Sequence, residues 1–124
     1  MGQIRDFRDL DVWHCSLDLV EEVHRLTKRL PVEEKFALAS QLHRAAVSVS
    51  TNIAEGYGRD SRAEFRRFLR ISRGSVTEVL AILLIVERLH YLGATELAAA
   101  LSLTDRIRAM LTRLTAALGR TEIR

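Results

Sequence analysis

The sequence predicts an all-α protein, folded as an antiparallel up-down-up-down four-helix bundle. Apolar residues recur every three or four positions in four consecutive blocks, and no segment alternates in the manner of a strand. The connections between the blocks are only a few residues long, so neighbouring helices must run antiparallel. With 124 residues, of which 48% are hydrophobic, the chain is expected to form one domain around one core.

The first helix is expected over about residues 10–29, with Asp9 as its N-cap. Its apolar positions form two adjacent stripes, which are Trp13, Leu17, Val20 and His24, and Leu19, Val23, Leu26 and Leu30. The second helix is expected over 33–57, after Pro31, with Glu33 and Glu34 at the positive end of its dipole. Its inner face comprises Leu38, Leu42, Ala45, Val49 and Ile53.

Glycines mark the ends of the predicted helices. Gly56 or Gly58 is expected to take the left-handed conformation that ends the second helix. The third helix, 61–92, begins with a capping box of Ser61 and Glu64, and Gly93 ends it. The fourth helix, 95–118, ends at Gly119, and its apolar register is Leu97, Leu101, Thr104, Ile107, Leu111, Leu114 and Leu118.

The net charge of +3 is concentrated in one segment. Residues 59–73 hold six arginines against two acids, a balance of +4, which leaves −1 for the rest of the chain. A second basic stretch, 104–124, has a balance of +3, from Arg106, Arg108, Arg113, Arg120 and Arg124 against Asp105 and Glu122. The bundle topology brings the start of the third helix, the end of the fourth and the N-terminal Arg5 and Arg8 to one basic pole.

Arginines in the third helix follow steps of three and four residues, so they form one row along the helix: Arg59, Arg62, Arg66, Arg70 and Arg73. The planar guanidinium fork binds phosphate oxygens in pairs, so this arginine row predicts nucleic acid as the partner. The alternative is a solvated helix face, in which Arg62 and Arg66 pair with Glu55, Glu64 or acids of neighbouring subunits. Phe65, Phe68, Leu69, Ser72 and Val76 form the adjacent buried face, and Tyr57 in the turn is the candidate for stacking on a base.

Polar residues recur beside the apolar stripes of the second and third helices: Gln41, Arg44, Ser48, Asn52 and Glu55, and Ser72, Ser75 and Glu78. If they are buried, each needs a hydrogen-bond partner. We favour a bundle layer or a subunit interface over an active site with Glu55 or Glu78 as acid or base. The set considered for this polar layer is Arg44, Asn52, Glu55 and Ser75.

No enzyme class is supported by a motif. The histidines, His14, His24, His43 and His90, form no metal-binding pair, and the sequence has no phosphate loop, nucleophile elbow or Cys/His dyad. We therefore expect no cofactor and no metal. A remote alternative is a metal-independent ribonuclease, in which Arg8 stabilises phosphate charge and His14 is the acid or base.

The segments 7–31, 41–59 and 64–93 closely resemble one family. The most specific pieces are Asp9-Leu10-x-Val12-Trp13, Gln41-Leu42-x-Arg44-Ala45-Ala46, Asn52-Ile53-Ala54-Glu55-Gly56 and Gly74-Ser75. The family is that of proteins encoded by intervening sequences in bacterial 23S ribosomal RNA genes, also called ribosomal protein S23-like. It includes relatives of the accessory variability determinant of diversity-generating retroelements.

The resemblance implies a four-helix bundle that assembles into a homopentameric ring with a basic surface and has no enzymatic activity. The retroelement accessory protein binds nucleic acid and a reverse transcriptase. The family pattern falls on Arg44, Asn52, Glu55, Gly56, Arg59, Phe65, Phe68 and Ser75, and its basic character on the arginine row. His43 and His24 depart from it, since an arginine and a tyrosine are expected at those positions.

Together these observations predict a non-enzymatic homo-oligomer, which the resemblance implies is a pentamer. It is expected to bind nucleic acid, with RNA favoured over DNA, through phosphate contacts. The alternative is a protein-interaction scaffold or accessory subunit that docks a partner such as a reverse transcriptase. The longest apolar run, Val79 to Val86, is far shorter than the roughly 20 residues of a membrane span, so no membrane partner is expected. The single cysteine, Cys15, and the lack of a signal peptide predict a cytoplasmic protein.

Overall fold

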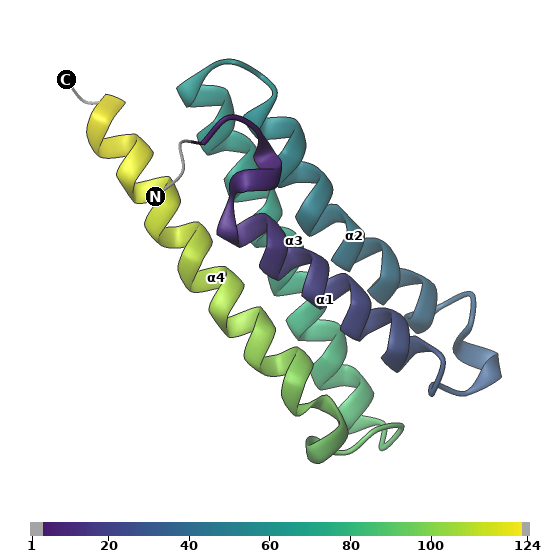
Figure 1. The fold of residues 1–124 in the computed structure, drawn as a ribbon. Coiled ribbons are helices and arrows are strands. Elements are labelled where there is room, and N and C mark those ends of the chain that lie inside the picture. Colours follow the sequence, from purple (N-terminus) through teal and green to yellow (C-terminus); the bar gives the residue numbers. More distant parts are fainter. Residues whose placement is uncertain (1–3, 123–124) are drawn as a thin grey trace.

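The computed structural model describes residues 4–122 of the chain, and the side chains of 4–120. Its α-helices are α1 (Asp11–Thr27), α2 (Leu38–Tyr57), α3 (Arg62–Arg88) and α4 (Ala94–Glu122) (Figure 1). Two short 3₁₀ helices, η1 (Phe7–Asp9) and η2 (Val32–Glu34), precede α1 and α2. The described part of the chain contains no strand, so the predicted all-α class is confirmed.

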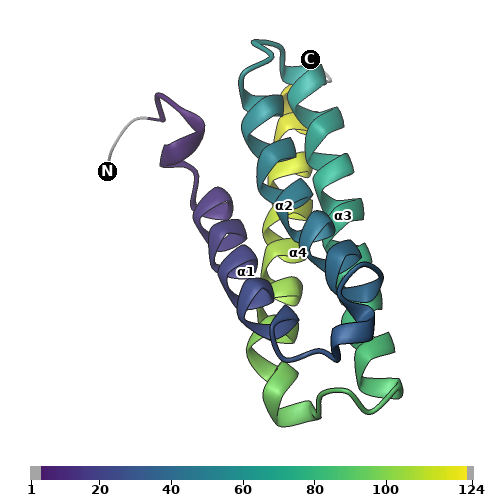
Figure 2. The same cartoon turned by 90° about the vertical axis from the view of Figure 1, so that its right-hand side faces the viewer.

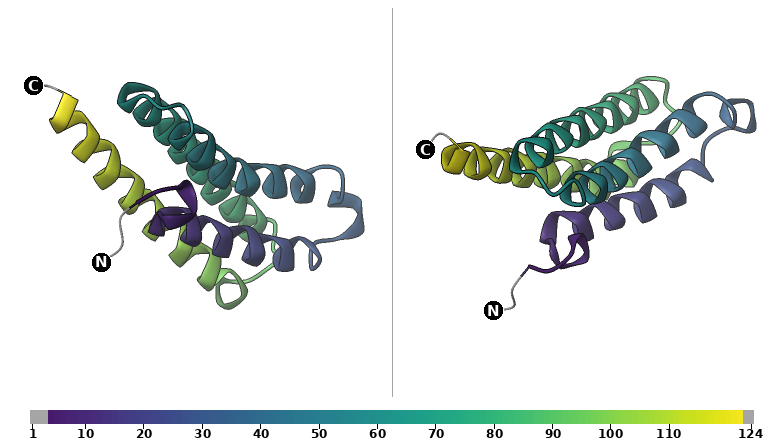
Figure 3. Two further views of the ribbon diagram at one scale, coloured as in Figure 1. Left: turned by 45° about the horizontal axis from the view of Figure 1, so that its top comes forward. Right: turned by 90° about the horizontal axis from the view of Figure 1, so that it is seen from above.

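The helices form an antiparallel bundle in which each helix packs against two others. α1 contacts α2 and α4, and α3 contacts the same two helices. The α2–α3 turn and the end of α4 lie at one end of the bundle, and the α1–α2 and α3–α4 connections lie at the other (Figures 1 and 2). The expected sharing of one pole by the start of α3 and the end of α4 is therefore observed (Figure 3).

The core is built from the aliphatic stripes that the periodicity predicts. Its fully buried large side chains are Leu19, Leu26, Leu42, Ile53, Leu69, Leu83, Leu97, Ile107 and Leu111. Of the two stripes of α1, the one that includes Leu19 is buried. The other lies at the edge, where Trp13 and Val20 pack against the core from outside and Leu17 and His24 are exposed.

The start of the second helix was predicted too early. Residues 33–37 form the end of η2 and a turn, and α2 begins at Leu38. Ala37 has φ −120° and ψ −103°, outside the helical region, which separates the two elements. Glu34 still acts near the helix start, because its Oε1 accepts a hydrogen bond from the Leu38 amide at 3.4 Å.

The prediction that Asp9 is the N-cap of the first helix is wrong. Leu10 occupies that position and makes no side-chain capping bond. The Asp9 carboxylate instead accepts from the Arg5 amide at 2.9 Å. Capping occurs one element earlier, where Asp6 Oδ1 accepts from the Arg8 amide at 2.8 Å at the start of η1.

The prediction that a left-handed glycine ends the second helix is also wrong. The described glycines have no positive φ, and the left-handed residues are Asp60 (φ 57°), after α2, and His90 (φ 62°), after α3. The third helix ends at Arg88, before the predicted end at residue 92. The fourth helix continues past Gly119, its predicted stop, to Glu122.

Two of these glycines have packing roles instead. A Cβ on Gly56 would lie 2.5 Å from Phe68 Cβ, which no real contact tolerates, so this glycine lets α2 and α3 approach closely. A Cβ on Gly119 would lie 2.7 Å from Nη2 of Arg66, so this glycine makes room for an arginine of α3.

Candidate nucleic-acid interface

The basic segment begins with the sharp turn from α2 into α3. Ser61 caps α3, because its Oγ accepts from the Glu64 amide at 3.2 Å, as the capping box predicts. The Glu64 carboxylate pairs with Arg67, accepting hydrogen bonds from its Nε and Nη2 at 3.1 and 3.2 Å, in place of the reciprocal bond of a capping box. These hydrogen bonds lower the pKa of Glu64 below its ordinary 4.5.

Arg59, the first member of the arginine row, is held within the fold. Its Nη2 donates to Glu55 Oε2 at 2.8 Å, an exposed ion pair across the last turn of α2. Its guanidinium also lies over the Phe68 ring, 5.0 Å from the ring centroid, and Arg67 lies 4.7 Å from the same centroid. The buried Phe68 thus orders two cations, and Arg67 is a neighbour that the spacing argument left out of the row.

Arg66 has a structural role. It is half-buried, and its Nε donates to the Thr115 carbonyl of α4 at 3.2 Å. The guanidinium packs against Gly119, so Arg66 joins α3 to the last turns of α4. We therefore do not include it among the side chains available to a ligand.

Arg62 and Arg70 are exposed, and within the described residues neither pairs with a carboxylate. The pairing expected of a solvated face is absent here, because Glu55 and Glu64 are engaged by Arg59 and Arg67. These two arginines therefore carry uncompensated charge on the same side of α3.

Arg73 completes the row at the α3–α4 boundary. Its Nη1 donates to Thr112 Oγ1 at 3.0 Å, which fixes the guanidinium beside α4. Arg108 and Arg113 of α4 line the same hollow as Arg73. The sequence assigned these two residues to a second basic stretch, but only the packing of α4 places them beside the row. Arg124 of that stretch lies outside the described residues.

The aromatic residues near the row pack against each other. Tyr57 and Phe65 meet edge to face, with ring centroids 5.5 Å apart and planes at 88°. Both are half-buried, and Phe68 is buried as predicted. Tyr57 thus has a partner inside the protein and only part of its surface is open for stacking.

The polar layer forms a hydrogen-bonded seam between α2 and α3. The Ser48 and Ser75 hydroxyls lie 2.9 Å apart, and Asn52 Nδ2 donates to the Ser48 carbonyl and Oγ at 2.8 and 2.9 Å. Further along the seam, Gln41 Nε2 donates to Glu78 Oε2 at 3.4 Å. The seam lies at the outer edge of the bundle instead of inside it, since its side chains are half-buried or exposed.

Two neighbours of the seam differ from this pattern. Ser72 is fully buried and donates to the Val49 carbonyl at 2.8 Å. Arg44 is exposed and pairs with no carboxylate of the described residues. No described side-chain nitrogen or oxygen is buried without a partner.

Arg8 and His14, the residues of the ribonuclease alternative, are both exposed, and each has a partner within the protein. Arg8 Nε donates to Asp6 Oδ1 at 2.8 Å, and the ring Nε2 of His14 lies 2.6 Å from the Arg8 carbonyl oxygen. The hydrogen bond with Arg8 lowers the pKa of Asp6. Among the described residues, no group of three or more His, Cys, Asp or Glu side chains is arranged to hold a metal ion. Among the helices that the structure describes, none has an apolar stretch that could span a lipid bilayer.

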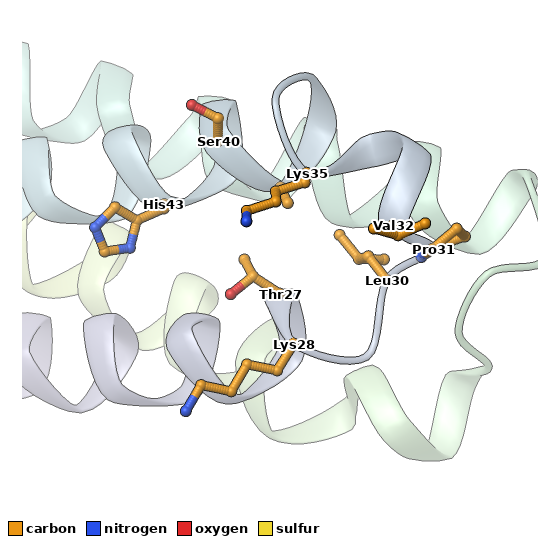
Figure 4. Close-up of a pocket in the computed structure, with 9 residues that line it drawn as sticks. Thr27, Lys28, Leu30, Pro31, Val32, Lys35, Ser40 and His43 are labelled. Atoms are coloured by element: carbon orange, nitrogen blue, oxygen red, sulfur yellow. The ribbon is translucent and has the colours of Figure 1, made fainter.

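An apolar hollow lies at the opposite pole, between the end of α1 and the start of α2. It has a volume of about 520 Å³, and Figure 4 shows Thr27 and Leu30 on one side and Lys35 and His43 on the other. Nearby, Val32 and Phe36 are 83% and 89% exposed. This pole therefore offers apolar contacts, in contrast to the basic pole.

Comparisons with known proteins agree with the fold. Residues 8–113 match the family model described as 23S rRNA-intervening sequence protein. A solved structure from Bacteroides thetaiotaomicron, described as a protein with unknown function from the S23 ribosomal protein family, is 26% identical and superposes with a TM-score of 0.78. The match covers 84% of this chain and 97% of that one. The comparison with curated proteins gave no match. With a family match over most of its length, the chain belongs to the 23S rRNA-intervening sequence protein family.

Proposed function

We propose that the protein is a non-enzymatic, homo-oligomeric helical bundle that binds nucleic acid through phosphate contacts, and that its ligand is RNA in preference to DNA. The observation that carries this proposal is the uncompensated charge of Arg62 and Arg70 on one side of α3, with Arg73 on the same helix edge. From Arg62 to Arg73 the helix rises about 16 Å at 1.5 Å per residue, so the guanidiniums can contact different phosphates of one strand. Contacts of this kind position a strand and read little of its sequence.

The charge arrangement supports an anionic partner at this row. Glu55 and Glu64 beside the row pair with Arg59 and Arg67, so the acid left unpaired beside the row, among the described residues, is Asp60 in the turn before α3. Arg59 and Arg67 are also held against the Phe68 ring, which orders their guanidiniums in advance of binding. We also propose a cytoplasmic location, which the free, buried Cys15 supports, because disulfides are rare in that compartment.

Assembly into a ring, a pentamer by family resemblance, would repeat the row and raise avidity without any new contact type. We assign the contact between copies to the outer face of α2 and α3. On this face Ile71, Ile85 and Leu89 are 41%, 44% and 48% exposed, and a Cβ on Gly74 would meet no atom within 4 Å. Arg44, Glu55 and the seam with Asn52 and Ser75 lie beside this apolar strip and would set its register.

Native mass spectrometry of Ile85→Lys tests this assembly. The mass is expected to fall to that of a smaller oligomer or a monomer, because the lysine cannot be buried in an apolar contact. Leu84→Lys is the control, since Leu84 is similarly exposed, at 50%, but points to a different side of α3. An unchanged mass for Ile85→Lys would remove this face from the assembly.

A salt titration of RNA binding tests the main proposal. We expect Arg62→Ala/Arg70→Ala to bind a labelled single-stranded RNA more weakly than the native protein, with the salt slope reduced by up to about 1.4, or roughly 0.7 for each lost phosphate contact. The control is Lys28→Ala/Arg88→Ala, which removes the same charge at the opposite pole. Equal losses in both variants would show a general charge effect, and no binding by the native protein at low salt would refute the function.

The second candidate is an accessory subunit that docks a protein partner such as a reverse transcriptase. The apolar hollow in Figure 4, with the exposed Val32 and Phe36 beside it, favours this candidate. The two candidates use opposite poles. Phe36→Ser should therefore abolish capture of a protein partner at matched salt while RNA binding is unchanged, if docking occurs at this pole.

A further inference from the structure

The packing of α4 against α3 creates a basic hollow that the arginine row alone does not reveal. It has a volume of about 530 Å³ and is lined by Arg73, Thr77, Asp105, Arg108, Ala109, Thr112 and Arg113. Three arginines face one acid, so the lining carries an excess of two positive charges. None of the three arginines is paired with a carboxylate of the described residues, Asp105 included.

The donors in this hollow are partly preorganised. Arg73 Nη1 donates to Thr112 Oγ1 at 3.0 Å, which holds the guanidinium at the helix boundary. Because that oxygen acts as acceptor, the Thr112 hydroxyl proton remains available to an anion. Arg108, which is half-buried, and Arg113, which is exposed, line the hollow from the α4 side, and Arg113 also lines the neighbouring hollow between α1 and α4. Guanidinium groups from two helices around one space match the oxygens of a tetrahedral phosphate.

We propose that this α3–α4 hollow is a phosphate-binding site that holds one phosphate of the bound nucleic-acid strand. The inference rests on the proposed function, and it adds Arg108, Arg113 and Thr112 of α4 to the contact surface. It also fixes the path of the strand, which runs from Arg62 and Arg70 on the outer side of α3 into the α3–α4 boundary.

Substitutions of Asp105 and Arg108 are expected to change phosphate affinity in opposite directions. Its carboxylate lines the hollow and repels an anion, so Asp105→Asn is expected to tighten phosphate binding severalfold. Arg108→Gln is expected to weaken it about tenfold, the effect of one lost charge-assisted hydrogen bond. Arg106→Gln is the matched control for Arg108→Gln, because Arg106 lies on the same helix but lines the hollow against Asp11 and Asp18 of α1, which Arg108 does not line.

The experiment follows the arginine Nε–Hε signals of the full chain by NMR, at constant ionic strength set with sodium chloride. Two probes are titrated separately: the dinucleotide UpU, which carries one phosphodiester, and inorganic phosphate. Saturable shifts of Arg73, Arg108 and Arg113 with UpU, and no shift of Arg88, support the proposal. A site that takes inorganic phosphate but not UpU overturns it as a strand contact.

The variants decide the remaining outcomes. If Arg106→Gln weakens UpU binding as much as Arg108→Gln, or if Asp105→Asn fails to tighten it, the hollow is not the site. Should circular dichroism show that Arg108→Gln is misfolded, the exposed Arg113→Gln takes its place with the same expected loss. Loss of RNA binding in Arg62→Ala/Arg70→Ala together with no effect of Arg108→Gln overturns the hollow and leaves the proposed function standing.

Discussion

The close approach of α2 and α3 makes Gly56→Ala a sharp test of the packing. The new Cβ would lie 2.5 Å from Phe68 Cβ and 3.3 Å from Phe65 Cδ1. Phe68 Cβ is next to the backbone and cannot rotate away, so the helices must separate, at a cost of about 1–3 kcal/mol for overpacking. Alanine recovers at most about 1 kcal/mol of helix propensity. Because the clash involves an atom fixed to the backbone, the overpacking cost is expected in the upper part of its range, about 2–3 kcal/mol, which leaves a net loss of about 1–2 kcal/mol.

Gly74→Ala is the matched control for this substitution. Gly74 also lies in a helix, but a Cβ there would meet no atom of its own chain within 4 Å, so the propensity gain of about 0.5–1 kcal/mol is unopposed within one copy. Because Gly74 lies on the face that we assign to the contact between copies, the comparison is made only where the variant and the native protein have the same native mass. At roughly 4 °C for each kcal/mol in a chain of this size, the melting temperatures should move about 4–8 °C down and about 2–4 °C up.

Thermal and urea unfolding followed by circular dichroism measure both changes, at one protein concentration. Native mass is recorded for each variant, because a changed oligomer would shift the stability by mass action. A Gly56→Ala protein that is as stable as the native one, at unchanged mass, would refute the argument that this glycine is required for helix contact.

Three further predictions follow from individual contacts. Arg66→Ala should lower the free energy of unfolding by about 1 kcal/mol, the size of one lost net hydrogen bond, whereas Arg62→Ala should leave urea unfolding unchanged because that side chain is exposed and unpaired. Ser72→Ala should also cost about 1 kcal/mol in urea unfolding, since it removes a buried hydrogen bond; a stability equal to that of the native protein would contradict this. The pKa of Glu64 lies below its ordinary 4.5 in the folded state, so its stabilising contribution is complete above about pH 4.5 and is lost as the pH falls through the folded value. NMR titration should show this lowered pKa, and Arg67→Gln should return it toward 4.5, because the Arg67 hydrogen bond is its largest cause.

The sequence by itself determined the helices, their antiparallel order and the aliphatic core. These features depend on periodicity and on short connections, which are local properties of the chain. It also located the charge, because the arginine row needs only helical spacing. The capping bond of Ser61 was predictable for the same reason, since the residues that form it lie within one turn.

Tertiary structure decided what each arginine and glycine does. Arg66 and Arg62 have the same sequence signature, yet Arg66 donates to a carbonyl of α4, 49 positions away in the chain, and Arg62 remains unpaired. Gly56 reads as a helix stop, but Phe68 on the next helix requires it. The basic hollow, likewise, exists because α3 and α4 pack side by side. Which partner a side chain meets depends on contacts between distant segments, and no local pattern encodes them.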